Sequence, residues 1–442
     1  MSATGPSVGF RIPYEQGAAM RQTMKAGTAV AGIALLLAAC GGEDSGSSET
    51  TSSAPAVSGE LLIWADASSN VAKTVEPLCQ QWATDNGVTC TVKKYNDLTS
   101  IRDDVVKAND TGEVPDIFIG PHDWLGELNK NGVVAPIDLS ANASNFQESA
   151  LAASNYGGQN YGVPWGVENV ALFVNTDLAP DCPASLDEAA DLGAKLVSDK
   201  KATLGIALQI GTDGDAYHWY PLYSADGGYI FGENADGSLN PEDLGVGQEG
   251  SIAAAERLKG LADDGVIKAS ASYDIAREAF AKGKAPYFIT GPWQVGDQSE
   301  ALGDALKICP VPNWEGSSSE SQPLVGVQMF FQTQKAPNPV LASTFLNDYV
   351  MTTEFMDAMY AGEPRPPAWI ESYDKAAAAD PNIAAFGEYG ATGTPLPAIP
   401  EMASVWTDLG LAEYKVASGK APEATMTAAG DSITKAIAAQ QG

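Results

Sequence analysis

From residue 59 onward, short apolar runs alternate with segments that have the pattern of helices. This alternation constrains the fold more than any other feature of the sequence. The first and third runs are almost wholly apolar, which is typical of buried strands, and the segments between runs carry apolar residues at helical spacing. The expected strands are 59–64, 88–95 and 115–120, and the expected helices are 71–84 and 98–108. Strand, helix, strand, helix, strand predicts an α/β region with a mainly parallel sheet.

The chain is too long for one ordinary core. Its 442 residues, of which 44% are hydrophobic, predict two lobes or domains with large buried cores. No internal repeat is visible. We expect further helices at 186–197, 251–264, 273–282, 340–359 and 402–440, strands at 204–210, 285–290 and 324–332, and an extended segment at 161–174.

The first 40 residues contain an export signal. Arg21 and Lys25 precede an apolar run, residues 26–39, that is too short to span a bilayer and is typical of a signal peptide. The run ends in Leu-Ala-Ala-Cys40 followed by two glycines, which resembles the lipobox of bacterial lipoproteins, where the Cys is lipidated and becomes the first mature residue. The alternative is an ordinary secretory peptide that happens to contain a Cys.

We therefore predict a protein held at the outer face of the cell membrane. Residues 1–39 are the expected signal peptide, with Met20 or Met24 as an alternative start, and Cys40 is the expected lipidation site. Residues 40–58 are Gly, Ser, Thr and acids with almost no apolar side chains, so we expect a flexible tether.

The chain is strongly acidic. It carries 56 Asp and Glu against 25 Lys and Arg, a net charge of −31. Such a chain is repelled by nucleic acid and by anionic lipid, so we expect no nucleic-acid partner and no docking through a basic patch.

Four cysteines remain besides the lipobox residue. An even number in an exported protein indicates disulfides, for which three pairings exist. Cys79 lies in the first expected helix and Cys90 in the next strand, and a helix packed on its following strand can bring such positions together. We therefore pair Cys79 with Cys90 and, by elimination, Cys182 with Cys309.

Two sequence motifs of known chemistry occur in the wrong context. Residues 5–9 match a nucleophile elbow but lie in the expected signal peptide, and residues 245–250 match a dinucleotide fingerprint but follow a turn instead of a strand. His122 and His218, the two histidines, are far apart. The sequence therefore predicts no cofactor and no metal site.

Aromatic residues and carboxylates recur together at expected loop edges. A sugar presents an apolar face of C–H groups, on which aromatic rings stack, and hydroxyls, which donate hydrogen bonds to carboxylates. Loops at strand ends are where an α/β sheet places aromatic rings and carboxylates for a ligand. Any one of these residues is more often core or solvated loop, so the recurrence is the signal. The residues are Trp64 and Asp66, Asp123 and Trp124, Trp165 and Glu168, Asp215 with 217–220, Trp293, and Trp406.

An ordered series of short segments resembles the family-1 extracellular solute-binding proteins of ABC importers, in particular their maltose/maltodextrin-binding branch. Each segment is weak alone, but the series runs from about Leu61 to the end. The segments are Leu61–Trp64, Pro115–Ile117 leading to His122 and Asp123, Pro164–Asn175, Tyr220–Leu222, Ala225–Phe231, Tyr273–Phe280, Gly291–Trp293, Val325–Val327, and Ile399–Met402 with Trp406.

The resemblance implies a fold and a function. The fold is a two-lobed, type II periplasmic-binding-protein-like α/β structure with the ligand cleft between lobes joined by three hinge crossovers. The N-terminal lobe would comprise 59–166 and 312–366, and the C-terminal lobe 167–311 and 367–442. The function would be that of a monomeric extracytoplasmic lipoprotein, not an enzyme, that binds a sugar of the maltose/maltodextrin type and delivers it to an ABC permease.

The resemblance also implies a site, in which the first-lobe half departs from the maltodextrin pattern. An acid–Lys pair is replaced by Ser68-Ser69, a Trp by Gly120, an Arg by Trp124, and a late helical Arg by Gly410. Because of these departures, the resemblance implies a sugar ligand more strongly than it implies maltose. The predicted sugar-binding residues are Asp66, Ser68, Asp123, Trp124, Glu168, Asp215, Tyr217, Trp293 and Trp406.

Two other functions use the same residues. Paired carboxylates in a sugar cleft are also what a glycoside hydrolase needs. Acid-rich loops also permit a non-sugar solute such as a polyamine or a metal chelate. The resemblance to binding proteins argues against the enzyme, and the Trp positions favour a sugar over the other solutes.

Overall fold

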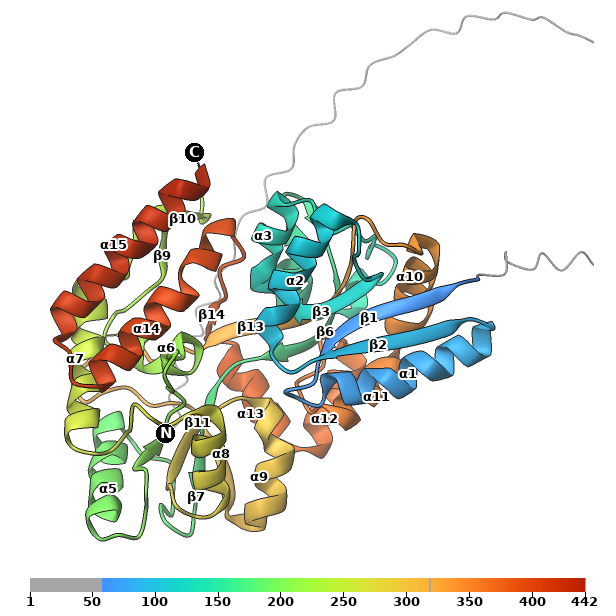
Figure 1. The fold of residues 1–442 in the computed structure, drawn as a ribbon. Coiled ribbons are helices and arrows are strands. Elements are labelled where there is room, and N and C mark those ends of the chain that lie inside the picture. The colour runs from blue at the N-terminus through green and yellow to red at the C-terminus, as the bar shows by residue number, and fades with distance from the viewer. Residues whose placement is uncertain (1–57, 318, 442) are drawn as a thin grey trace, which may run out of the picture. The chain divides into compact units, whose positions relative to one another are not determined.

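Two β-sheets organise the part of the chain that the computed structural model describes, residues 58–317 and 319–441 (Figure 1). All of these residues belong to one compact unit, Pro55–Gly442. The expected signal peptide, the lipobox with Cys40 and nearly all of the tether lie outside the described residues.

The first sheet has six strands in the order β14-β13-β3-β1-β2, with β6 paired to β13. β1 runs parallel to β2 and β3, which confirms the parallel arrangement predicted for the first three strands, whereas β13 runs antiparallel to β3 and β6. The strands are β1 Glu60–Asp66, β2 Thr89–Tyr95, β3 Ile117–Pro121, β6 Val163–Glu168, β13 Leu324–Gln332 and β14 Thr394–Pro395.

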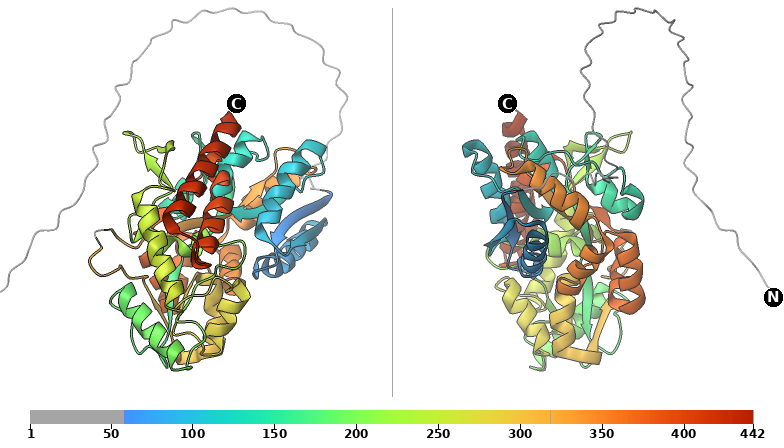
Figure 2. Two further views of the ribbon diagram at one scale, coloured as in Figure 1. Left: turned by 60° about the vertical axis from the view of Figure 1, so that its left-hand side comes forward. Right: turned by 90° about the vertical axis from the view of Figure 1, so that its right-hand side faces the viewer.

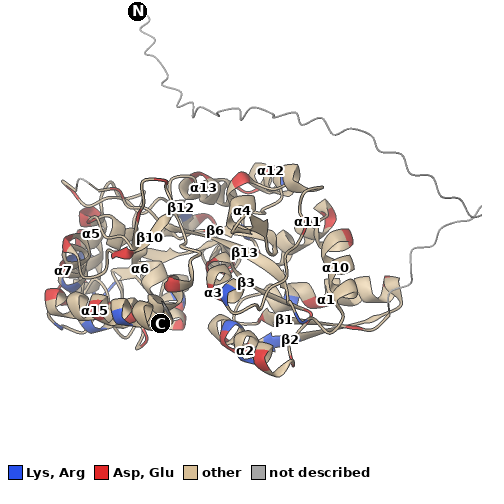
Figure 3. Ribbon diagram, turned by 90° about the horizontal axis from the view of Figure 1, so that it is seen from above, with Lys and Arg blue, Asp and Glu red and all other residues tan. Residues whose placement is uncertain are grey.

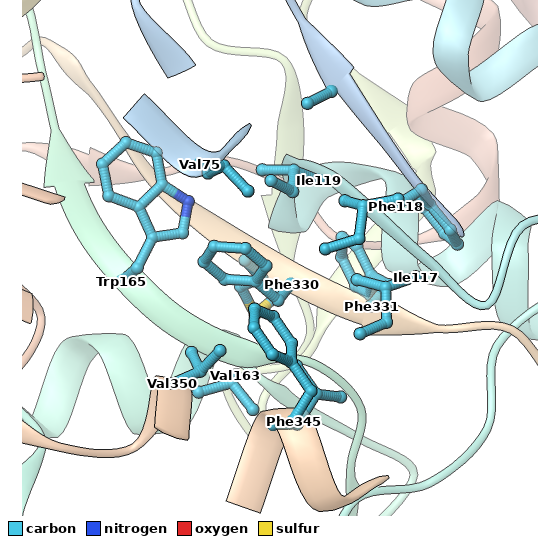
Figure 4. Close-up of a cluster of buried hydrophobic side chains, with 14 of the residues drawn as sticks. Val75, Ile117, Phe118, Ile119, Val163, Trp165, Phe330, Phe331, Phe345 and Val350 are labelled. Atoms are coloured by element: carbon cyan, nitrogen blue, oxygen red, sulfur yellow. The ribbon is translucent and has the colours of Figure 1, made fainter. Parts of the chain in front are cut away.

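The core of this sheet is built from chain segments far apart in sequence. Figure 4 shows Phe118 of β3 and Phe331 of β13 lying side by side, and their rings are stacked with centroids 5.1 Å apart. Trp165 of β6 and Phe345 are also fully buried in this cluster. Burying each such side chain contributes roughly 1.5–3 kcal/mol, so β13 is tied to β3 by packing as well as by its hydrogen bonds.

Helices flank this sheet, and one of them is shorter than the sequence predicts. The single helix expected at 340–359 ends at Phe345, continues as one π-turn and restarts at Thr353, because Thr352 Oγ1 accepts a hydrogen bond from Phe355 N at 3.2 Å and caps a new helix. The helices are α1 Val71–Asn86, α2 Leu98–Thr111, α3 Leu125–Lys130, α4 Glu148–Ala153, α10 Pro339–Phe345, α11 Thr353–Gly362 and α12 Ile370–Ala379.

The second sheet has four strands in the order β12-β7-β11-β8. Alternate residues of β7 enter different cores: Leu172 and Val174 lie on one face, and Ala171 and Phe173 lie on the other. The strands are β7 Ala171–Asn175, β8 Ile206–Ala207, β11 Tyr287–Thr290 and β12 Leu306–Cys309.

β8 is shorter than the strand expected at 204–210. The amides on either side of it donate to loop carbonyls instead of to a strand: Gly205 N to Val266 O, and Ile210 N to Ala271 O. The strand predicted at 204–210 is therefore confirmed only at Ile206–Ala207, and the backbone around it is satisfied mainly by loops.

Helices cover both faces of the second sheet. The helix expected at 402–440 is interrupted, because Gly419 has φ +93° and Pro422 begins a new helix. Figures 1 and 2 show the two resulting helices, α14 and α15, side by side. The helices are α5 Leu186–Ser198, α6 Ala216–Ser224, α7 Glu249–Asp263, α8 Tyr273–Ala281, α9 Val295–Leu302, α13 Pro381–Gly390, α14 Trp406–Ala417 and α15 Pro422–Gln441.

Smaller elements complete the fold. They are the hairpins β4 Asn155–Tyr156 with β5 Gln159–Asn160 and β9 Phe231–Glu233 with β10 Leu239–Leu244, the π-turn η5 Leu346–Val350, and the 3₁₀ turns η1 His122–Trp124, η2 Ala143–Asn145, η3 Pro292–Gln294, η4 Gly303–Ala305 and η6 Pro400–Ser404.

The chain passes between the two sheets repeatedly. Asn169 and Val170 connect β6 of the first sheet to β7 of the second, and residues 310–323 return from β12 to β13. A further passage leads from α12, which packs on α11, to α13, whose Phe386 lies in a core of the second sheet.

Each sheet region carries one disulfide. Cys79 of α1 is bonded to Cys90 of β2, and Cys182 is bonded to Cys309 at the end of β12, with Cα–Cα distances of 5.9 Å in both pairs. These are the two pairs expected from the sequence.

Charged side chains are spread over the outer helices. Figure 3 shows Asp and Glu on helices of both sheet regions instead of in one patch. Among the described residues no helix is both long enough and apolar enough to cross a membrane.

Candidate functional site

Three predicted carboxylates meet at one edge of the first sheet. Asp66 is the last residue of β1, Asp123 lies in the 3₁₀ turn after β3, and Glu168 is the last residue of β6. The three strands run in the same direction, so their carboxyl ends lie at the same edge. This is the placement that the sequence predicts for ligand-facing loops.

Predicted aromatic residues lie on elements of the second sheet region. Trp293 follows β11, Tyr217 is in the first turn of α6, and Trp406 begins α14. All three are partly buried and pack against the second core. The ring centroids of Tyr217 and Trp293 are 6.3 Å apart, so these two residues form one aromatic cluster.

The turns after β3 and β11 are built alike. Each contains a Gly-Pro pair, which ends β3 in the first turn and directly follows β11 in the second, and in each a 3₁₀ turn leads into a short helix. A Cβ on Gly120 would lie 2.1 Å from the ring of Trp124, and a Cβ on Gly291 would lie 2.1 Å from the ring of Trp293. Each glycine therefore leaves space for an indole. We call residues 120–124 the first corner and residues 291–294 the second corner. The Phe-Ile pairs just before the two corners and the Gly-Pro pairs within them are a sequence signal that could have revealed this similarity.

The two indoles do not have the same surroundings. Trp124 is 5% exposed and lies inside the first core, whereas Trp293 is partly exposed and its ring centroid lies 5.7 Å from that of His218. The structure therefore separates Trp124 from the other predicted ring residues. A ring in the core is explained by packing alone.

Two of the predicted carboxylates are occupied by their own loops. Asp66 accepts hydrogen bonds from the backbone and hydroxyl groups of both Ser68 and Ser69, at 2.6–3.2 Å. Asp215 caps α6 by accepting from His218 N at 3.0 Å, and it also accepts from Gln209 Nε2. These oxygens have little capacity left for a further donor.

Asp123 has fewer partners. Its Oδ2 accepts from Trp406 Nε1 at 3.1 Å, a contact that joins an element of the first sheet region to one of the second. Burial raises the pKa of this carboxyl to about 6, because the charged form is poorly solvated there. The neighbouring His122 is buried too, and burial lowers its pKa to about 4.

Glu168 belongs to a buried ionic network that the sequence did not reveal. Its Oε2 accepts from Arg365 Nε and its Oε1 from Gln328 Nε2 at 2.9 Å. Arg365 Nη1 donates to Glu363, whose other oxygen accepts from Asn70 N at 2.9 Å. The pair Glu168–Arg365 is separated by 197 residues, and no local sequence signal pointed to Arg365.

The guanidinium of Arg365 lies between two indoles. Its Cζ is 5.4 Å from the ring centroid of Trp165, which is buried in the first core, and 5.4 Å from that of Trp293. Both distances fit cation–π contacts. Arg365 thus connects the ionic network to the second corner.

Tyr217 contributes a polar group without a partner. Its hydroxyl is buried and makes no hydrogen bond to any described residue. Burial raises the pKa of Tyr217 well above its usual value, and the charge of Glu168 adds to the effect, so the phenol stays neutral. A buried hydroxyl without a partner is costly unless a ligand or water satisfies it.

The cluster thus offers one acceptor at Asp123, one hydroxyl at Tyr217, guanidinium donors at Arg365, and the rings of Trp293 and Trp406. No group of His, Cys, Asp and Glu suited to a metal ion occurs within the described ranges. A cavity of about 590 Å³ has a different lining, formed by the β9–β10 hairpin, the segment 319–324 and β14, and it includes none of the predicted site residues.

Relatives of known role match most of the chain. A galactooligosaccharide-binding protein of Bacillus subtilis is 29% identical over 405 residues, 88% of this chain and 91% of the relative. A maltooligosaccharide ABC transporter solute-binding lipoprotein of Streptococcus pneumoniae is 27% identical over 441 residues, 94% of this chain and 96% of the relative. A maltotriose-binding protein of Pyrococcus abyssi is 26% identical over 365 residues, 80% and 77% of the two chains.

The model of one protein family matches residues 78–385, which include both corners, the whole second sheet and all of the first sheet except β1 and β14. Its description is bacterial extracellular solute-binding protein. The chain therefore belongs to the family of bacterial extracellular solute-binding proteins, as the ordered sequence segments predicted.

Proposed function

We propose that this protein captures an oligosaccharide for an ABC importer. The observation that carries the proposal is the cluster of Tyr217, Trp293, Trp406 and Asp123, which combines ring faces with a buried hydroxyl that lacks a partner and a carboxylate with one partner. Rings and hydrogen-bonding groups together suit a ligand with C–H faces and hydroxyls. The relatives that bind maltooligosaccharides and galactooligosaccharides support the same ligand class.

We place the ligand between two lobes, each built mainly on one of the two sheets. The proposed lobes are 59–166 with 312–366 and 167–311 with 367–442, joined by three hinge crossovers as in a type II binding-protein fold. Asp123 belongs to the first lobe, and Trp293 and Trp406 belong to the second. A ligand that touches both stabilises a closed arrangement, which is the form that the permease would recognise.

The test of closure is small-angle X-ray scattering with and without saturating ligand. Closure predicts a smaller radius of gyration in the saturated protein. An unchanged radius would contradict the hinge and leave a rigid binder.

We further propose that Cys40 carries the lipid anchor and that the protein works as a monomer at the outer face of the membrane. Supporting this are the lipobox-like segment and the lipoprotein name of one relative. Cys40→Ala should accumulate as an uncleaved precursor or be released. Membrane retention identical to wild type would contradict the anchor.

The ligand itself is tested by thermal unfolding followed by calorimetry. Maltotriose and a galactotriose should be compared with spermidine and with a metal chelate, because a ligand that binds the folded state raises the melting temperature. We expect at least one of the two trisaccharides to raise it, without being hydrolysed. A shift with spermidine alone, or release of shorter sugars, would overturn the proposal.

A further inference from the structure

Arg365 is buried and paired with two carboxylates, unlike a typical surface arginine. Its side chain is 7% exposed and forms ion pairs with Glu168 and Glu363, which are 7% and 0% exposed. A buried arginine of this kind is expensive to desolvate, and breaking such a pair is costly. The arrangement therefore fixes one guanidinium at one place beside the second corner.

The guanidinium keeps unused donors. Nε serves Glu168 and Nη1 serves Glu363, while Nη2 makes no hydrogen bond to any of the described residues. Arginine has five N–H donors in a rigid plane, so fixing two nitrogens also fixes the direction of the third. The buried hydroxyl of Tyr217, which has no partner either, belongs to the same cluster through the ring of Trp293.

The charge around Arg365 is not neutral. Two carboxylates face one guanidinium, and Asp66 and Asp123 also lie at this edge of the first sheet. An anionic ligand beside Trp293 would therefore meet net negative charge in a poorly solvated place, whereas the hydroxyls of a neutral ligand can use both the donor and the acceptors.

Resting on the proposed sugar-binding function, we propose that Arg365 contacts the ligand and that the net negative charge of its ionic network selects neutral over acidic oligosaccharides. Its Nη2 donates to a hydroxyl of the sugar unit that lies against Trp293. Glu168 and Glu363 are positioning residues, which hold the guanidinium within cation–π distance of the indoles of Trp165 and Trp293.

A second stacked arginine provides a matched control. Arg257 lies 4.7 Å from the ring centroid of Trp314 and faces Asp187 and Asp226 at 3.6 and 3.7 Å, so it combines a Trp with two carboxylates as Arg365 does. Trp314 is in the second core, and none of these four residues is in the predicted site. Lysine in place of arginine keeps the charge but loses the planar fork at both positions.

The experiment is calorimetry with maltotriose and with the same trisaccharide carrying a C6 carboxylate on its terminal unit. We expect wild type to prefer the neutral sugar at least tenfold. Arg365→Lys should weaken maltotriose binding at least tenfold, and Arg257→Lys should change it less than twofold. Melting temperatures of both variants, measured without sugar, separate a binding effect from a loss of fold.

Each outcome decides something. Wild type that binds neither sugar contradicts the proposed function itself, whereas binding by wild type together with undiminished binding by Arg365→Lys contradicts only the role of Arg365. Equal affinities of wild type for the two sugars overturn the selection of neutral ligands. If Arg365→Lys does not fold, Glu363→Gln replaces it: removing one negative charge should reduce the preference for the neutral sugar at least threefold, and an unchanged preference overturns the proposal.

Discussion

The two corners use the same local structure for opposite purposes. At both, a glycine before a proline leaves space for an indole at the end of a strand, and a Cβ on that glycine would approach the indole to 2.1 Å. At the first corner the ring of Trp124 closes the core, and the residue before it, Asp123, is the candidate ligand contact. At the second corner the ring of Trp293 is itself the candidate contact.

The difference comes from the number of residues between glycine and tryptophan. Trp124 is four residues after Gly120, whereas Trp293 is two residues after Gly291. The longer spacing carries the ring round the 3₁₀ turn into the core, and the shorter spacing leaves it at the sheet edge, beside Tyr217. Spacing within one turn thus decides whether an indole stabilises the fold or faces the candidate site.

The largest expected difference between the corners is in the removal of the rings. Trp124→Ala should lower the free energy of unfolding by about 3–5 kcal/mol, because it empties a buried site. Trp293→Ala should cost less stability but at least ~1.4 kcal/mol of binding, a tenfold loss of affinity. Urea unfolding followed by circular dichroism measures the first effect, and calorimetry measures the second. Equal loss of stability in the two variants would contradict the division of roles.

Adding a methyl group to each glycine gives a smaller effect. Gly120→Ala should lower the free energy of unfolding by about 1–3 kcal/mol, since the ring of Trp124 is confined by the core and cannot move away. Gly291→Ala should displace the freer ring of Trp293 and weaken sugar binding more than it weakens the fold. Crystal structures of both variants would show which ring moves. An undisturbed Trp293 ring with full affinity would refute the expectation.

The contribution of the first corner to stability should depend on pH between about 4 and 6.5, because Asp123 and His122 are titratable there. Because the pKa of Asp123 is raised to about 6, this carboxyl keeps its proton in the folded state at pH values where the unfolded chain has lost it. Its contribution to the free energy of unfolding therefore falls as pH rises from about 4 to about 6. Lowering the pKa of His122 to about 4 has the opposite effect, because stability is lost as pH falls below 6.5. The two effects nearly cancel in the wild type.

Asp123→Asn should therefore expose the effect of His122. The free energy of unfolding of the variant should rise between pH 4 and 6 relative to wild type, by about 1–3 kcal/mol. At the second corner Gln294 is uncharged and hydrogen-bonds to Gln298 and Tyr273, so Gln294→Asn is the control that leaves the pH dependence unchanged. Parallel pH profiles for Asp123→Asn and wild type would show that Asp123 has an ordinary pKa.

The smallest effect is expected at β1, next to the first corner. Ser68→Ala removes one of the hydroxyl donors to Asp66 and should lower stability by about 0.5–1.5 kcal/mol. Sugar affinity should stay within twofold, because the carboxylate already serves its own loop. A tenfold loss of affinity would return Ser68 or Asp66 to the ligand contacts.

Local patterns in the sequence predicted the elements well and their interruptions poorly. The apolar run 324–332 became β13 with the same limits, because nine consecutive buried residues leave no alternative to a central strand. Helix breaks at Thr352 and Gly419 were missed, since one cap or one positive φ competes with a long apolar pattern. The strand at 204–210 was too long for the same reason: burial is visible in sequence, but the partner of each amide is not.

The sequence predicted some members of the candidate cluster but not the contacts that connect them. Residue types at loop edges pointed to Tyr217 and Trp293, which the structure brings together. Nothing local marks Arg365 as the partner of Glu168, because that contact depends on how β6 and a segment 197 residues later lie in space. The saturation of Asp66 by its own loop is likewise visible only in three dimensions.

The position of β13 has a consequence for the order in which the chain becomes structured. β13 lies between β3 and β6, yet residues 169–323 separate it from β6 in sequence. β3 keeps an unpaired edge until the chain has emerged as far as residue 332, and the first sheet is complete only when β14 has emerged, at residue 395. Contacts of such long range form slowly. The early strands therefore cannot assemble their complete sheet while the later strands are still missing.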